Sequence, residues 1–119
     1  MRDHRKLRAF ELADELAIGF YAATKTFPKE EQFGLTSQIR RAAVSIASNI
    51  VEGSARHSQA DYVRFLDMAF GSVREVQYQL TIAQRLGYLS QEIAARLDSQ
   101  ADETARVLAG LLNSLRRPD

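Results

Sequence analysis

The longest amphipathic segment of the chain spans residues 58–88 and reads SQADYVRFLDMAFGSVREVQYQLTIAQRLGY. Its apolar residues recur every three or four positions, which places them on one face of an α-helix. They are Tyr62, Phe65, Leu66, Ala69, Val73, Val76, Leu80 and Ala83. Ser58 has the spacing of an N-cap to Asp61, and Gly87 followed by Tyr88 is typical of a helix C-terminus. The pattern predicts a helix over residues 58–86.

Two segments before it show the same period. Residues 7–26 place Phe10, Ala13, Leu16, Ala17, Phe20 and Thr24 on one face, and Pro28 cannot continue that helix. Residues 36–53 place Ile39, Ala42, Ala43, Ile46 and Ile50 together. Thr36 is the expected N-cap of this second helix, and Gly53 is its expected breaker.

A fourth helix is predicted over residues 90–116, with Ser90 as its N-cap. Its apolar stripe steps alternately by four and three residues, which is the period of bundle packing. The stripe comprises Ile93, Leu97, Ala101, Thr104, Leu108, Leu111 and Leu115. Short connections leave consecutive helices antiparallel. We therefore predict an all-α, antiparallel up-down-up-down four-helix bundle that forms one domain over residues 1–119.

The composition excludes several classes of protein. The 119 residues include no cysteine, which rules out disulfides and thiolate metal sites. The uncharged run from Leu16 to Ala23 is too short to span a membrane, so we expect a cytoplasmic protein. Neither histidine, His4 or His57, follows a glutamate at the three-residue spacing of a di-iron bundle site. We expect no metal, no cofactor and no enzymatic activity.

A polar stripe flanks the apolar face of the helix predicted over residues 36–53. The antiparallel helix that follows would bring polar side chains opposite it, and we expect an ion pair between Arg41 and Glu75. The resulting seam comprises Gln38, Arg41, Ser45, Asn49, Glu52, Ser72 and Glu75. It is either a structural network that specifies packing or a binding cleft or subunit contact.

Apolar residues also lie off the core faces of the two middle helices. They are Val44, Ala47, Val51, Val63 and Phe70. A monomeric bundle would gain nothing from such a stripe, which indicates contact between copies of the chain.

Net charge is only +1, but the predicted topology distributes the charges unevenly along the bundle. Residues 1–11, 52–64 and 113–119 meet at one end and contain eight basic and five acidic residues, whereas the rest contains eight basic and ten acidic residues. This basic end either keeps the protein in solution or contacts phosphates. The residues at this end that are candidates for binding nucleic acid are Arg2, Arg5, Lys6, Arg8, Arg56, Arg116 and Arg117. No aromatic residue is expected among them to stack on a base.

Several strings of residues carry a family resemblance. They are Phe27-Pro28 with Glu31, Gly34-Leu35, Gln38, Arg40-Arg41-Ala42, Ser45, Asn49-Ile50, Glu52-Gly53, Phe65, Ala69, Ser72, Glu75 and Leu86-Gly87-Tyr88-Leu89. Together they resemble the bacterial four-helix bundle proteins encoded in intervening sequences of 23S rRNA genes, the S23 family. The chain departs from that family in having no Trp in its first helix and in having Val51 where Ala is usual.

This resemblance implies a cytoplasmic bundle that assembles as a ring of five subunits and has no established catalytic activity. The accessory proteins of diversity-generating retroelements look similar in fold and associate with nucleic acid. Two hypotheses follow. The first is a non-enzymatic homo-oligomer whose basic ends bind RNA or DNA without reading sequence. The alternative is a protein-interaction scaffold that does not bind nucleic acid.

Overall fold

The computed structural model describes residues 2–117 of the chain. In this range the chain forms four long α-helices and two short 3-10 turns, and no strand. The helices are α1 (Arg8–Thr24), α2 (Leu35–Ser54), α3 (Gln59–Arg85) and α4 (Gln91–Arg116). The 3-10 turns are η1 (His4–Lys6), before α1, and η2 (Lys29–Glu31), before α2.

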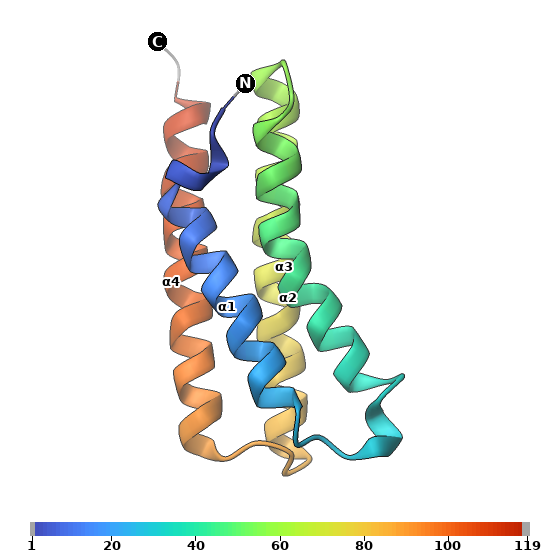
Figure 1. Cartoon of the computed structure of the whole chain (residues 1–119). Helices are drawn as coiled ribbons and strands as arrows, with labels where there is room; N and C mark the ends of the chain where they lie inside the picture. Colours follow the sequence, from blue (N-terminus) through green and yellow to red (C-terminus); the bar gives the residue numbers. More distant parts are fainter. Residues whose placement is uncertain (1, 118–119) are drawn as a thin grey trace.

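The four helices form an antiparallel bundle with extents of 49 × 23 × 19 Å. Successive helices run in opposite directions, and both ends of the chain lie at the end of the bundle that carries the α2–α3 turn (Figure 1). Each helix packs against its neighbour in the chain, and α4 also packs against α1. The predicted all-α four-helix fold is confirmed.

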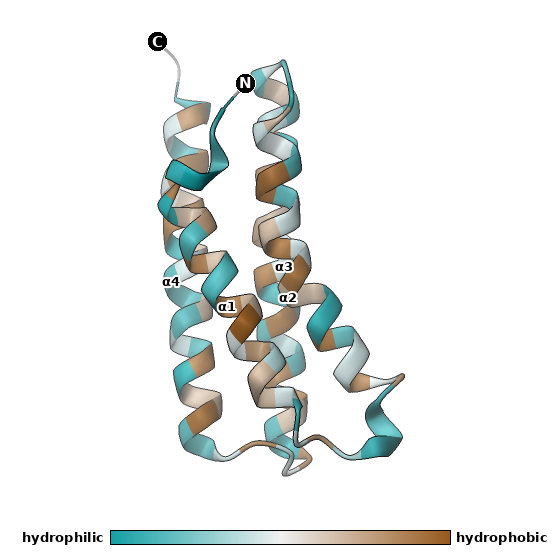
Figure 2. Ribbon diagram, viewed as in Figure 1, coloured by the Kyte–Doolittle hydropathy of each residue, from teal (hydrophilic) through white to brown (hydrophobic). Residues whose placement is uncertain are grey.

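Each helix buries one stripe of residues, so hydrophobic and hydrophilic residues alternate along all four ribbons (Figure 2). The largest fully buried side chains include Phe20, Leu16, Ile39, Ile46, Ile50, Leu66, Leu97 and Leu108. In α4 the buried stripe differs at both ends from the predicted one. Ala94 and Leu112 are buried, whereas Ile93, Leu111 and Leu115 are only half-buried. None of the helices within residues 2–117 is long and apolar enough to cross a membrane.

Three predicted helix ends are present. The Ser58 hydroxyl accepts a hydrogen bond from the Asp61 amide at 3.1 Å, and the Ser90 hydroxyl accepts one from the Ile93 amide at 3.2 Å. Gly87 adopts a φ of +78°, the left-handed conformation in which glycine lacks the steric cost of a side chain. The α3–α4 connection is therefore fixed by local residues.

The N-terminal end of α2 differs from the prediction. Thr36 is buried inside the helix rather than capping it. The cap comes from the preceding loop, where the Glu31 carboxylate accepts a hydrogen bond from the Leu35 amide at 3.0 Å. The other carboxylate oxygen accepts one from the Tyr88 hydroxyl at 2.9 Å. Glu31 thus links the α1–α2 loop, the start of α2 and the α3–α4 loop.

These bonds shift two pKa values. The bond from the Leu35 amide, with that from the Tyr88 hydroxyl, holds the pKa of Glu31 below its ordinary value. The same carboxylate raises the pKa of the Tyr88 phenol, because the phenol must keep its proton to donate.

Gly53 does not break α2. The helix continues to Ser54, and Gly53 is buried against α3 with an ordinary helical backbone. A Cβ at this position would lie 2.7 Å from Cβ of Phe65, closer than such atoms approach one another. Glycine is therefore required here by the close approach of two helices.

The first helix is shorter than the one predicted over residues 7–26. Asp3 accepts a hydrogen bond from the Arg5 amide at 3.1 Å and starts the separate turn η1. Leu7 is extended, so α1 begins only at Arg8. At its other end, Thr24 is the last helical residue, and its hydroxyl donates to the carbonyl of Phe20 at 2.8 Å.

Candidate functional site

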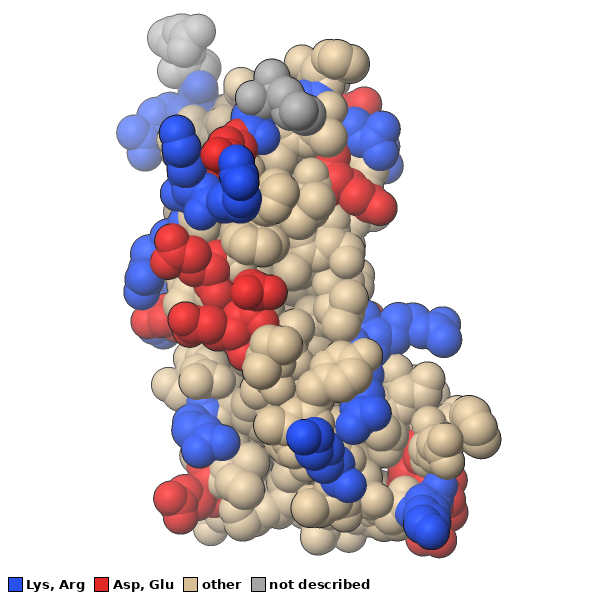
Figure 3. All heavy atoms as spheres, in the orientation of Figure 1, with Lys and Arg blue, Asp and Glu red and all other residues tan. Residues whose placement is uncertain are grey.

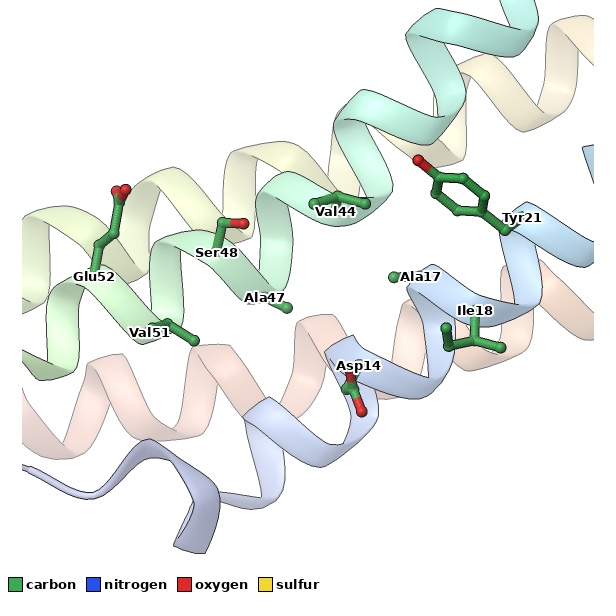
Figure 4. A pocket seen from close by; sticks show the side chains of 9 residues that line it. All are labelled: Asp14, Ala17, Ile18, Tyr21, Val44, Ala47, Ser48, Val51 and Glu52. Atoms are coloured by element: carbon green, nitrogen blue, oxygen red, sulfur yellow. The ribbon is translucent and has the colours of Figure 1, made fainter.

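A shallow groove runs between α1 and α2. It has a volume of about 420 Å³. Val44, Ala47 and Val51 of α2 project toward α1 across it, as three of the five predicted interface residues (Figure 4). We call this surface the α1–α2 groove; it is lined by Asp14, Ala17, Ile18, Tyr21, Val44, Ala47, Ser48, Val51 and Glu52.

The α1 side of this groove is not among the interface residues predicted from the sequence. Ile18 is 68% exposed and Tyr21 is 42% exposed, so two large apolar side chains face solvent beside those of α2. Ile18 follows Asp14 by four residues and Tyr21 follows Ile18 by three, so the three side chains share one face of α1, next to its buried stripe. This second helical spacing, beside that of the core residues, is the sequence signal that could have indicated the α1 side of the groove. The uncharged surface along the middle of this face is visible in Figure 3, beside acidic side chains gathered over α1.

Val63 and Phe70 do not join this groove. Both are half-buried and pack against the core. The guanidinium of Arg74 lies over the ring of Phe70, 5.0 Å from its centroid, and pairs with Asp102 of α4 at 3.5 Å. Phe70 therefore faces α4, and Val63, seven residues earlier, shares that face. Val63 and Phe70 therefore do not continue the α2 stripe, because the two helices turn these residues to opposite sides of the bundle. Their contact with another copy of the chain stays a prediction.

The predicted polar seam is present only in its middle. The Ser45 and Ser72 hydroxyls are hydrogen-bonded at 2.9 Å and join α2 to α3. Asn49 donates from its side-chain amide to the carbonyl of Ser45 at 2.9 Å and to its hydroxyl at 3.0 Å. All three side chains are half-buried. This short network is positioned to fix how α2 and α3 pack.

The expected ion pair between Arg41 and Glu75 is absent among residues 2–117. Both side chains are exposed, and the Glu75 carboxylate instead accepts a 3.4 Å hydrogen bond from Gln79. Gln38 and Glu52, two further members of the expected seam, are exposed as well. Long side chains at the edge of a helix contact reach water at little cost, so topology alone does not force them to pair.

The basic end forms as the topology predicts. Lys and Arg side chains gather around the end that holds both chain termini (Figure 3). Arg5, Arg8 and Arg116 belong to it and remain 77%, 63% and 50% exposed. Arg117 and Lys6 are exposed too, whereas Asp119, counted at this end, lies outside the described residues.

Most of these cations already have a partner within the chain. Arg5 pairs with Asp3 at 2.9 Å, Arg8 with Glu103 at 3.6 Å, and Arg116 with Asp67. The Asp3 carboxylate has its pKa lowered by the hydrogen bond from the Arg5 guanidinium. These pairs are exposed and screened by solvent, so they are weak and a phosphate can displace them.

Contrary to expectation, aromatic rings do lie among these bases. The guanidinium of Arg2 lies over the ring of Tyr62 at 4.0 Å, and that of Arg56 lies over Phe65 at 4.6 Å. Arg2 also donates to the carbonyl of Arg56 at 3.1 Å. Both rings are otherwise buried, so they hold the protein's own arginines and offer no face to a nucleic-acid base.

Comparison with known proteins identifies the family. The profile of the family described as 23S rRNA-intervening sequence protein matches residues 5–110. The chain belongs to the 23S rRNA-intervening sequence protein family. It is also similar to the crystal structure of a protein of unknown function from the S23 ribosomal protein family of Bacteroides thetaiotaomicron. That likeness has a TM-score of 0.81 at 23% identity and covers 88% of this chain and 95% of the other, which supports the fold. No curated protein matches in sequence.

In this member of the 23S rRNA-intervening sequence family, the two histidines have ordinary surroundings. The His4 ring packs edge-on against Phe10, with 4.8 Å between centroids, and His57 is exposed in the α2–α3 turn. Within residues 2–117, no three side chains of the types that bind metals lie close enough together to hold an ion.

Proposed function

We propose that this protein is a non-enzymatic bundle that self-associates through the α1–α2 groove. The observation that supports this is the row of exposed apolar side chains along the groove, from Tyr21 and Ile18 to Val44 and Val51. Contiguous apolar surface of this kind is typical of an interface rather than of a free helix face. The occupant is a second copy of the chain.

The groove lies on one side of the bundle, so two arrangements of copies are possible. Groove against groove gives a dimer, whereas groove against a different surface gives a ring when the rotation closes. The family resemblance favours the ring, with five subunits. In a ring the basic end of every copy points the same way, which multiplies its charge.

Native mass measurement tests this proposal. At about 50 μM, well into the range where weak assemblies form, the wild type should have a single mass above that of the monomer. Val44→Asp and Ile18→Asp should give monomers of unchanged helicity, because each buries an unpaired carboxylate in the interface. Ala95→Asp, on an exposed face of α4, is the matched control and should assemble normally. A monomeric wild type, or dissociation of the control, contradicts a groove interface.

We further propose that the basic end contacts nucleic acid through phosphates, without reading sequence. The exposure of Arg5, Arg8 and Arg116 supports this, since their weak ion pairs leave the guanidinium groups accessible. The family description names 23S rRNA, so a fragment of that RNA and an unrelated one are the appropriate probes.

The test replaces Arg5, Lys6, Arg116 and Arg117 together with Gln. Fluorescence anisotropy should show that this variant binds both RNAs more weakly and with a flatter dependence on salt, because each lost phosphate contact removes about one released counterion. The control replaces four exposed cations at the opposite end, Lys25, Lys29, Arg85 and Arg96, and so has the same net charge. Equal losses in the two variants, or no binding by the wild type at low salt, favours a protein-interaction scaffold.

A further inference from the structure

A polar hollow of about 440 Å³ lies between the N-terminal half of α2 and the middle of α3. We call it the α2–α3 pocket; its functional walls are Phe33, Ser37, Gln38, Arg41 and Glu75. It lies across α2 from the α1–α2 groove and away from the basic end. The two hollows have no lining residue in common, but they adjoin on α2, since Arg41 and Ser45 also border Tyr21 and Val44.

Two opposite charges line the pocket without neutralising each other. Arg41 and Glu75 are both exposed, and among the described residues neither forms an ion pair. The guanidinium offers a planar fork of N–H donors, and the carboxylate offers two acceptor oxygens. Gln79, which is buried, donates to Glu75 from one side and helps to hold the carboxylate in place. The pocket thus presents a donor group and an acceptor group to one occupant.

Besides the two charged side chains, the pocket has an aromatic ring that is exposed to solvent. Phe33 is 90% exposed, although its backbone lies in a well-tied loop. The Gly34 amide donates to the Glu31 carbonyl at 3.0 Å, and the Glu31 carboxylate caps Leu35 at 3.0 Å. A large apolar ring held at the mouth of a polar pocket provides a stacking surface for a flat ligand.

We propose that the α2–α3 pocket binds an unpaired guanine base stacked on Phe33. Guanine carries two N–H donors on its Watson–Crick edge, at N1 and N2, which suit the carboxylate of Glu75. Its adjacent O6 and N7 acceptors suit the guanidinium of Arg41. Gln38 and Ser37 line the same pocket and supply further hydrogen-bonding groups.

The other bases fit these walls less well. Adenine and cytosine present a ring-nitrogen acceptor on the Watson–Crick edge, which would face the acceptor oxygens of Glu75. Uracil offers only one N–H donor to the carboxylate. Guanine is thus the one standard base whose donors and acceptors are both matched in this pocket.

Titration followed by amide NMR tests the proposal, with GMP and AMP as probes. GMP should shift the amides of Ser37, Gln38 and Arg41 in a saturable way and bind about tenfold more tightly than AMP, the discrimination of one good bidentate contact. Glu75→Gln and Phe33→Leu should each weaken GMP binding by about tenfold, through loss of an acceptor and of stacking. Arg74→Gln, on another face of α3, should bind normally.

The free base and the base in a strand are distinguished by a second pair of probes, UUGUU and UUAUU RNA. Tighter binding of UUGUU than of GMP indicates a site for an RNA strand, and equal binding indicates a nucleotide site. Absence of saturable shifts, equal affinity for GMP and AMP, or undiminished binding by Glu75→Gln overturns the proposal. Because Phe33 and Glu75 are exposed, their variants should fold, and circular dichroism checks this.

Discussion

Replacement of Gly53 by alanine should destabilise the bundle, although alanine favours helices. The new Cβ would lie 2.7 Å from Cβ of Phe65 and 3.4 Å from the ring of Tyr62. The closest atom sits next to the backbone of α3, so the contact is relieved only when α2 and α3 move apart. Overpacking of this kind costs about 1–3 kcal/mol. It outweighs a helix-propensity gain of at most about 1 kcal/mol.

Gly71→Ala is the matched control. Gly71 is exposed in the interior of α3, and a Cβ there would have no atom within 4 Å. This variant should be more stable than the wild type by about 0.5–1 kcal/mol. Both variants gain the same propensity, so the difference between them isolates the clash at Gly53.

Urea denaturation followed by circular dichroism measures this difference. All three proteins are compared at one concentration, since self-association would otherwise alter the apparent stability. The midpoints of the two variants should differ by on the order of 1 M urea, with Gly53→Ala the lower. Equal stability of Gly53→Ala and Gly71→Ala would show that the distance between α2 and α3 is not limited by this contact.

Four further predictions concern polar side chains. Because the pKa of Glu31 is lowered, its contribution to the free energy of unfolding is complete above the ordinary pKa of 4.5 and is lost as pH falls through the folded pKa. Glu31→Gln should therefore be less stable than the wild type at neutral pH and lose less stability on acidification, which urea midpoints at each pH measure. The raised pKa of Tyr88 has the opposite effect on the pH dependence: its contribution to stability is present below pH 10 and is lost as pH rises through the folded pKa. Tyr88→Phe should therefore lose less stability than the wild type above pH 10, where Tyr62, whose pKa burial also raises, still contributes a loss. Arg41→Ala should change the free energy of unfolding, measured by thermal denaturation, by less than about 0.5 kcal/mol, because the side chain is exposed and unpaired. Ser45→Ala should cost about 0.5–1.5 kcal/mol through its bond across the helices, whereas exposed Ser48→Ala should cost less.

The sequence predicts the helices well because their signals are local. Ser58 and Ser90 cap helices whose first turns immediately follow them, and Gly87 ends one at a backbone angle that suits glycine. A buried stripe repeats every three or four residues, so its register is visible within a single helix. The errors in the predicted helix boundaries lie at helix ends, where a 3-10 turn or one extended residue changes the boundary.

Contacts between distant residues could not be obtained in this way. Glu31 caps α2 and accepts from Tyr88, a residue 57 positions later, and no local pattern links the two. The sequence places Arg41 and Glu75 on facing helices, and both line one pocket, yet among residues 2–117 they form no ion pair. Periodicity gives the face of a residue but not the distance between side chains, which depends on helix rotation and on competing partners such as Gln79.

The geometry of α2 explains how one helix can serve two surfaces. Val44, Ala47 and Val51 point toward α1, whereas Gln38, Arg41 and Ser45 line the pocket beside α3. These sets lie on opposite flanks of the buried stripe, because each step of one residue rotates the side chain by about 100°. The flank toward α1 is apolar and suits a protein surface, while the flank toward α3 carries donors and acceptors that suit a polar ligand. Assembly and ligand binding therefore do not compete for the same side chains of α2, and each can be removed by substitutions that leave the other intact.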